Sequence, residues 1–322
     1  MRNISLDILK VALAIFVFSI HIQLFAKSLP ITGYLLTDGI FRLAVPLFIV
    51  INGFFLARII GTDKVNGFLK KLLTLYILWM LIYAKYWFDV DNIPRTLITA
   101  VFGCFQLWYI PAVFLSTLTL NRLYQRSGRF FAVLCSGLFI IGLVVQGYVN
   151  ATSTGLSLAD KLFRLFYYRN FLFDGFPFLC LGYFTGKHIE RIKMTLPARG
   201  PLFLIAAVML VLLIGESCLY LSTFGLDSSN DLLIMTVPLS VLIFLIFSFV
   251  INIQGSSRAL ASFSSAFFFS HLLCIFIAKD ILLYLGDTRL NYHVVLSLAL
   301  SAVVSLILVR IKSRYPRMPL VV

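Results

Sequence analysis

The sequence predicts an all-α protein that crosses a membrane many times. The chain of 322 residues is 61% hydrophobic and 12% charged, and apolar runs of about 17–25 residues recur along it. A bilayer offers no water to unpaired backbone groups, so such runs form helices. The net charge of +14 sits mostly in short segments between the runs, which the positive-inside rule explains without nucleic acid. We predict one integral-membrane domain over residues 1–322, with no fused soluble domain.

Ten apolar runs predict about ten transmembrane helices. No small-residue cleavage site follows the first run, so we expect it to be retained as a helix. Pro46, Pro111, Pro177 and Pro238 fall inside spans, where broken helices often border cavities, although proline is also commoner in membrane helices generally. The predicted spans are 8–26, 38–57, 69–88, 97–120, 130–149, 170–186, 202–222, 232–252, 260–281 and 293–310.

The loops predict the orientation of the chain. One set of alternate loops carries most of the basic residues, including Lys70, Arg129 and Lys187, while the other set carries acidic residues such as Asp89 and Asp231. Because cytoplasmic loops carry an excess of Lys and Arg, both termini are expected in the cytoplasm. The first helix therefore runs outward.

This first helix carries three ionisable residues, Asp7, Lys10 and His21. Eleven steps of 100° bring Lys10 and His21 to within about 20° of one face, roughly 16 Å apart along the axis. Ionisable groups inside a span are expensive and indicate function. His21 either hydrogen-bonds a neighbouring helix or acts as a base towards an acceptor hydroxyl. Lys10 either pairs with Asp7 or binds the phosphate groups of a cofactor.

Two further spans carry candidate partners of His21. His271 lies near the middle of span 260–281, and Glu216 lies in the outer half of span 202–222. Either side chain would orient or polarise His21 if the helices meet. Glu216 has an alternative, structural role as the ion-pair partner of Lys85 or an arginine.

The outer ends of other spans offer candidate substrate-binding residues. Arg42 begins the second span beside Asp38, where snorkelling to the interface accounts for both. Trp108, in the segment FQLWYIP, suits a sugar face or an interfacial aromatic belt.

The segment 162–170 is short and aromatic, and it predicts an interfacial helix on the outer surface. Arg164, Arg169 and Asp174 are expected at this interface, where the arginines can face a glycan or a phospholipid headgroup.

Metal chemistry is not expected. The five cysteines are scattered without a CxxC pair and are typical of small buried residues. The four histidines show no metal-ligand spacing, and no phosphate-binding glycine motif is present.

Five motifs, in order along the chain, carry a resemblance to a known family. They are Asp7-Ile8-Leu9-Lys10 followed by His21, FRLAVPLFIVINGFFLA at 41–57, LWYI at 107–110, FPFLCLGYFTGK at 176–187 and SSAFFFSHLL at 264–273. The set resembles the acyltransferase-3 family of bacterial membrane acyltransferases, whose hallmark is Arg or Lys, ten residues and His in the first helix. Asn52 stands where serine is usual, Gln106 replaces a histidine, and His271 aligns with the family's late histidine.

The resemblance implies acyl transfer, most often of acetyl, from cytoplasmic acetyl-CoA to a hydroxyl of a lipid-linked or surface glycan such as O-antigen. The expected location is the bacterial inner membrane, and the expected partners are acyl-CoA, the glycan and membrane lipids; the oligomeric state is left open. The candidates are then His21, His271 and Glu216 for catalysis, Lys10 and Asp7 for the donor, and Arg42, Trp108 and Arg169 for the acceptor.

A transporter or flippase of glycan or lipid-linked intermediates is the alternative. Ten helices with intramembrane ionisable residues would suit one, but such a protein normally shows inverted repeats, and none is visible in this sequence.

Overall fold

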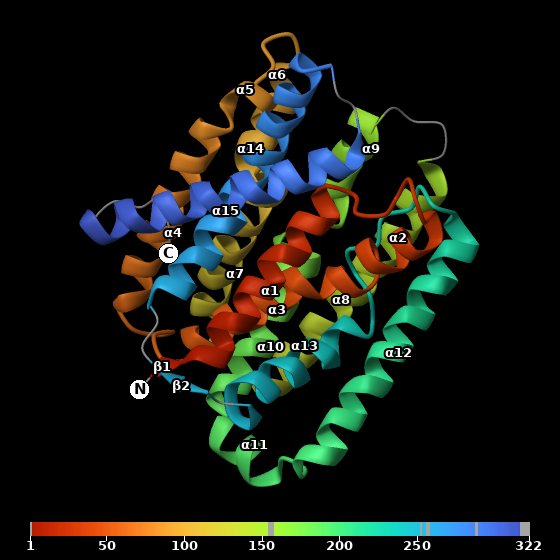
Figure 1. The fold of residues 1–322 in the computed structure, drawn as a ribbon. Coiled ribbons are helices and arrows are strands. Elements are labelled where there is room, and N and C mark those ends of the chain that lie inside the picture. The colour runs from red at the N-terminus through yellow and green to blue at the C-terminus, as the bar shows by residue number, and fades with distance from the viewer. Residues whose placement is uncertain (1, 154–157, 252, 256–257, 287–288, 316–322) are drawn as a thin grey trace.

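The computed structural model describes residues 2–153, 158–251, 253–255, 258–286 and 289–315, and helices dominate these ranges (Figure 1). The strand pairing within them is one short antiparallel ladder, in which β1 (Arg2–Asn3) pairs with β2 (Gln254–Gly255). α1 (Ile4–His21) runs through the middle of the bundle. The prediction of an all-α membrane protein is confirmed.

Seven helical segments among the described residues are long and apolar enough to cross a membrane. The first after α1 is Pro30–Leu56, made of α2 (Pro30–Thr37), the 3-10 turn η1 (Ile40–Leu43) and α3 (Ala44–Leu56). The others are α4 (Lys64–Ile82), α8 (Gly128–Thr152), α12 (Arg199–Phe224), α14 (Arg258–Tyr284) and α15 (Leu290–Arg314).

Three predicted spans take broken or shorter forms. α6 (Ile93–Phe102) and the pair η2 (Phe105–Trp108) and α7 (Tyr109–Leu123) form an apolar unit bent by 59°. The predicted span 170–186 is a π-helical turn, η4 (Phe171–Gly175), followed by α10 (Phe176–Lys187). The predicted span 232–252 is α13 (Thr236–Leu245) followed by η5 (Ile246–Val250). Ten crossings therefore stay a prediction. The short helices α5 (Ala84–Trp87), α9 (Leu158–Arg164), η3 (Leu165–Tyr167) and α11 (Ile189–Thr195) connect the larger elements.

The first predicted span is too long at its outer end. α1 ends at His21 rather than at residue 26, and the chain then turns through Gln23 and Phe25, whose φ angles are 52° and 65°. A positive φ is incompatible with a continuing right-handed helix. His21 therefore stands at the end of the helix, where it meets residues from the connecting segments.

Close backbone contact joins α3 to α10. A Cβ atom on Gly53 would lie 2.2 Å from the carbonyl oxygen of Leu179, and one on Gly182 would lie 2.1 Å from that of Val50. Only glycine permits this approach, as is typical of helix pairs in membranes. The contact fixes α3 and α10 against each other and sets the spacing of the elements that precede them, η1 and η4.

On the other side of α1, α14 packs against both α1 and α15. The buried residues of α15 are Ser297, Ser301 and Ser305, four residues apart on one face. Small side chains at this spacing allow a close approach of helices without a bulky interface. α14 is thereby held against α1, with His271 level with the end of α1.

Candidate functional site

A cavity of about 40 Å³ lies at the end of α1. Its lining includes His21 from α1, Arg42 from η1 and Trp108 from η2, together with Arg169 from the segment between η3 and η4. The structure thus brings together one predicted catalytic residue and all three predicted substrate-binding residues. The other polar residues of the lining are Gln106, Asp174 and Asp231.

His271 lies beside His21, and their ring centroids are 5.3 Å apart. The side chain of His271 is completely buried, and its Nδ1 lies 3.1 Å from the carbonyl oxygen of Phe267 and 2.8 Å from that of Phe268. Because carbonyl oxygens only accept, this geometry assigns the hydrogen to Nδ1 and leaves a lone pair on Nε2. Nε2 is buried and has no hydrogen-bond partner among the described residues. It is available to accept a proton or a hydrogen bond.

A buried carboxylate joins the two arginines of the cavity. Asp231 accepts a hydrogen bond of 2.7 Å from Arg169 and another from Arg42, and Arg42 also binds Asp38. Burial alone raises the pKa of Asp231, but the charges of Arg169 and Arg42 and their hydrogen bonds outweigh it and lower the pKa below its usual value. The cluster is therefore ionised at neutral pH.

Gln146 of α8 holds the segment that carries this carboxylate. Its side-chain oxygen accepts the backbone N–H groups of Asp231 and Leu232 at 2.9 and 2.8 Å, and its amide nitrogen donates to the carbonyl of Leu232 at 2.8 Å. All of these groups are buried, which makes each bond costly to lose. These bonds from α8 therefore hold Asp231 in place.

The interfacial interpretation of these arginines and of Trp108 is wrong. The side chains of Arg42 and Arg169 are only 10% and 15% exposed, because both turn inward to Asp231 instead of snorkelling. Trp108 is buried rather than part of an aromatic belt, and the guanidinium carbon of Arg169 lies 6.0 Å from its ring centroid. This distance suits a cation–π contact.

Asp174 lies in the site, although the sequence predicts it at the membrane interface. Its side chain is 1% exposed, it lines the cavity, and its Oδ1 has no hydrogen-bond partner among the described residues. Asn170 holds the turn η4 that carries it, because its side-chain oxygen accepts the backbone N–H groups of Leu172 and Phe173. A carboxylate within the apolar run FLFDGFPF was the signal that could have found it.

Other buried polar atoms around the cavity also lack partners within the described part of the chain. They are Oε1 of Gln106 and the Nε atoms of Arg42 and Arg169. The amide nitrogen of Gln106, by contrast, donates to Tyr83 at 2.9 Å and to the carbonyl of Phe269 at 3.2 Å. Buried polar groups in proteins are almost always satisfied. Several unsatisfied groups around one cavity therefore indicate a site for a polar ligand.

Lys10 and Asp7 lie near the opposite end of α1. The Lys10 Nζ is 4.0 Å from Asp7 Oδ1 and 5.7 Å from the ring centroid of Phe55, so the predicted pair forms at the limit of contact. The Lys10 side chain is 23% exposed while that of Asp7 is 3% exposed. Since α1 is continuous from Ile4 to His21, the separation of roughly 16 Å along the axis holds.

Glu216 has a different setting from the one expected of a catalytic residue. Its two carboxylate oxygens accept the backbone N–H groups of Ile234 and Met235 at 2.6 and 3.0 Å, just before α13 begins. A carboxylate at this position satisfies free donors at a helix start. These contacts involve neither His21 nor His271, and the partner in them is not Lys85. The structure therefore supports a capping role for Glu216.

The helices and the cavity define a multi-pass membrane protein with a buried histidine pair and a charged ligand site. The family model described as an acyltransferase domain matches residues 3–310. The chain therefore belongs to the acyltransferase-3 family, as the ordered motifs of the sequence predict.

Two curated proteins are similar to this chain. It is 29% identical to a serine/alanine racemase of Enterococcus gallinarum over an alignment of 271 positions that covers 78% of this chain and 38% of that protein. It is 26% identical to an amino-acid racemase of Enterococcus faecalis over an alignment of 324 positions that covers 91% of this chain and 44% of that protein. The chain thus spans less than half the length of these relatives. No solved structure matches it.

Proposed function

We propose that this protein is an O-acyltransferase of the bacterial inner membrane. It moves an acyl group, most often acetyl, from cytoplasmic acetyl-CoA to a hydroxyl of a lipid-linked or surface glycan such as O-antigen. The observation that carries the proposal is the pairing of His21 with His271 at a cavity where several buried polar atoms, Asp174 Oδ1 and Gln106 Oε1 among them, have no hydrogen-bond partner within the described part of the chain.

His21 is the proposed general base. It lines the cavity, whereas His271 lies behind it, and the Nε2 atom of His271 has no hydrogen-bond partner among the described residues. As the acceptor oxygen attacks the acyl carbon, its proton passes to an imidazole nitrogen of His21. The same imidazolium then returns that proton to the departing thiolate, so the base is regenerated. His271 Nε2 supports the cation that forms on its neighbour.

Hydrogen-bond acceptors in the cavity suit a hydroxyl-rich ligand. Sugar hydroxyls donate hydrogen bonds, and Asp174 Oδ1 and Gln106 Oε1 are buried acceptors without partners among the described residues. Trp108 offers an aromatic surface at the same cavity, of the kind on which the apolar face of a sugar packs. These groups would hold the acceptor with one hydroxyl towards His21.

Lys10 is the proposed donor-binding residue. Its partly exposed ammonium lies on the same helix as His21, at the end expected to face the cytoplasm. A point charge there would bind a phosphate of acetyl-CoA, with Asp7 keeping the ammonium oriented. The donor supplies a thioester, and the bond from its acyl carbon to sulfur breaks as the bond to the acceptor oxygen forms.

A second candidate is transport or binding of an amino acid or of a lipid-linked intermediate. The names of the two relatives refer to amino acids. A zwitterion would find both arginines in the cavity, together with the Asp174 oxygen that has no partner in the described ranges. A protein with this role would accumulate substrate inside vesicles without consuming acetyl-CoA.

The deciding experiment compares the two roles in one preparation. Purified protein in proteoliposomes is given labelled acetyl-CoA together with the lipid-linked glycans of the source cells, and separately labelled serine and alanine. We expect release of free CoA and label on the glycan, and we expect one O-acetyl resonance to disappear from the surface-polysaccharide NMR spectrum when the gene is deleted. An unchanged spectrum together with uptake of amino acids would overturn the proposal.

Substitution of Lys10 tests the donor site. Lys10→Arg retains the charge and is expected to keep most activity, whereas Lys10→Ala is expected to raise the apparent KM for acetyl-CoA by about tenfold, the effect of losing roughly 1.4 kcal/mol. The measurement is initial rate against acetyl-CoA concentration. If Lys10→Ala leaves that KM unchanged, Lys10 does not bind the donor.

A further inference from the structure

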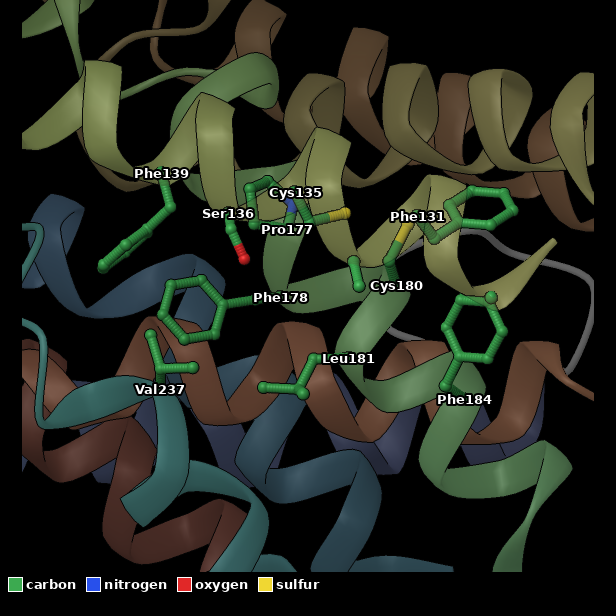
Figure 2. A pocket seen from close by; sticks show the side chains of 12 residues that line it. Phe131, Cys135, Ser136, Phe139, Pro177, Phe178, Cys180, Leu181, Phe184 and Val237 are labelled. Carbon is green, nitrogen blue, oxygen red and sulfur yellow. The ribbon is translucent and has the colours of Figure 1, made fainter. Parts of the chain in front are cut away.

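A large apolar cavity separates α8 from α10, away from the polar cavity. It measures about 370 Å³ and is lined mainly by apolar side chains of these two helices, with Val237 of α13 at its base. Figure 2 shows Ser136 and Phe139 of α8 pointing across it towards Phe178 of α10. We call it the lateral groove.

Small residues of α8 create this space. Gly128, Ala132 and Ser136 recur every four residues on one face and line the lateral groove. A Cβ atom on Gly128 would come into van der Waals contact with the Phe184 ring, at 3.9 Å, so glycine at this position keeps this end of the groove open. The neighbouring Val133 is 75% exposed, so the wall of the groove adjoins a surface that faces lipid in a membrane.

The length of the groove matches one leaflet of a bilayer. Its lining on α8 runs from Gly128 to Phe139, which is about 16 Å along a helix axis. Half of a hydrocarbon core of about 30 Å is about 15 Å. A dry engineered cavity of about 150 Å³ already binds an apolar ligand, so a larger apolar groove open to lipid is filled by a hydrocarbon chain.

Basic residues gather at one end of the groove. Arg126 and Arg129 flank Gly128, and Lys187 follows Phe184 at the end of α10, all three exposed. The nearby acidic Glu190 is already paired with Lys193 at 2.9 Å. The end therefore has a surplus of positive charge, on the side that the loop charges assign to the cytoplasm, where anionic headgroups attract basic residues.

From this we infer that the lateral groove binds one acyl chain of an anionic glycerophospholipid, whose phosphate lies against Arg129 and Lys187. The chain runs from the cytoplasmic surface along α8 and ends beside Phe139 and Phe178. The inference does not depend on the acyl-transfer reaction, because the groove residues are distinct from those of the polar cavity.

Native mass spectrometry of the full chain in detergent, titrated with phosphatidylglycerol and with phosphatidylcholine, tests the inference. We expect one tight phosphatidylglycerol site and weaker binding of phosphatidylcholine. Ser136→Phe fills the groove and is expected to weaken binding by about tenfold, because chain burial is lost. Val133→Phe, its neighbour outside the lining, is the matched control and should bind as the wild type does.

Headgroup variants provide an independent arm if Ser136→Phe does not fold. Arg129→Gln with Lys187→Gln should weaken phosphatidylglycerol binding by roughly tenfold and leave phosphatidylcholine binding unchanged. The control, Lys64→Gln with Lys70→Gln on α4, should leave the binding of both lipids unchanged. Equal binding of the two lipids, or wild-type affinity in Ser136→Phe, overturns the inference. The inference is also overturned if a copurifying polyprenyl lipid displaces phosphatidylglycerol, or if the protein is a dimer that Ser136→Phe dissociates.

Discussion

His21→Ala lowers the rate of glycan acylation by about 10²–10⁴-fold, the usual contribution of a general base. The side chain lines the polar cavity, and its ring centroid lies 5.3 Å from that of His271. Alanine leaves the acceptor hydroxyl without a proton acceptor, and His271 lies behind the position that His21 occupied. The measurement is transfer of labelled acetyl to glycan by purified protein in proteoliposomes.

The matched control is His293→Ala on α15, whose imidazole contacts the carbonyl oxygen of Ile275 away from the cavity. Both variants should elute as folded protein in size-exclusion chromatography, and His293→Ala should retain activity. Normal acylation by folded His21→Ala would remove His21 from the mechanism. Equal losses in the two variants would show that the effect is structural.

Asp231→Asn destabilises the protein by about 3–5 kcal/mol, the usual cost of breaking a buried ion pair. The substitution keeps the size of the side chain but removes the negative charge between Arg42 and Arg169. Arg42 retains Asp38 as a partner, so most of the loss falls on Arg169. Thermal unfolding in detergent measures the effect, and acylation is expected to fall with it because Arg169 no longer holds its place beside Trp108.

Asp227→Asn is the control for this variant. Asp227 lies four residues earlier and pairs with Lys161 at 3.0 Å, but its side chain is 85% exposed, so the change is expected within about 1 kcal/mol. Because the folded-state pKa of Asp231 is lowered, its stabilising effect is present at neutral pH and is lost as the pH falls through that value. The difference between wild type and Asp231→Asn should therefore shrink in acid. Equal unfolding temperatures at neutral pH would contradict the role given to Asp231.

The sequence predicts the helices well, because long apolar runs leave the backbone no alternative in a membrane. It does not predict where they break. The sequence predicts one unbroken span over 38–57. In the structure the chain breaks at Gly39, and the turn η1 directs Arg42 inward. At the break the chain packs against α12, where a Cβ atom on Gly39 would lie 2.7 Å from Ser217 Oγ, and this contact joins residues far apart in sequence.

In the candidate site, too, the sequence predicts the contacts made within one helix but not those made between distant segments. Lys10 and His21 are related by the period of a single helix, so their arrangement follows from the sequence alone. The sequence places Asp231 among the acidic residues of an outer loop, because nothing local distinguishes a carboxylate that folds back between two arginines from one that faces water. The capping contacts of Glu216 cannot be predicted for the same reason, since its partners before α13 lie in a different segment.

The contact of α3 with α10 has a consequence for motion. Backbones that touch at Gly53 and Gly182 have no side chains between them to rearrange, so the two helices move as one rigid body, carrying Arg42 and Asp174 together. The polar cavity holds little free volume, and a bulky substrate enters only if one wall swings away. His21 of α1 and Phe268 of α14 also line the cavity, so an opening on that side requires α1 and α14 to move relative to the joined α3 and α10.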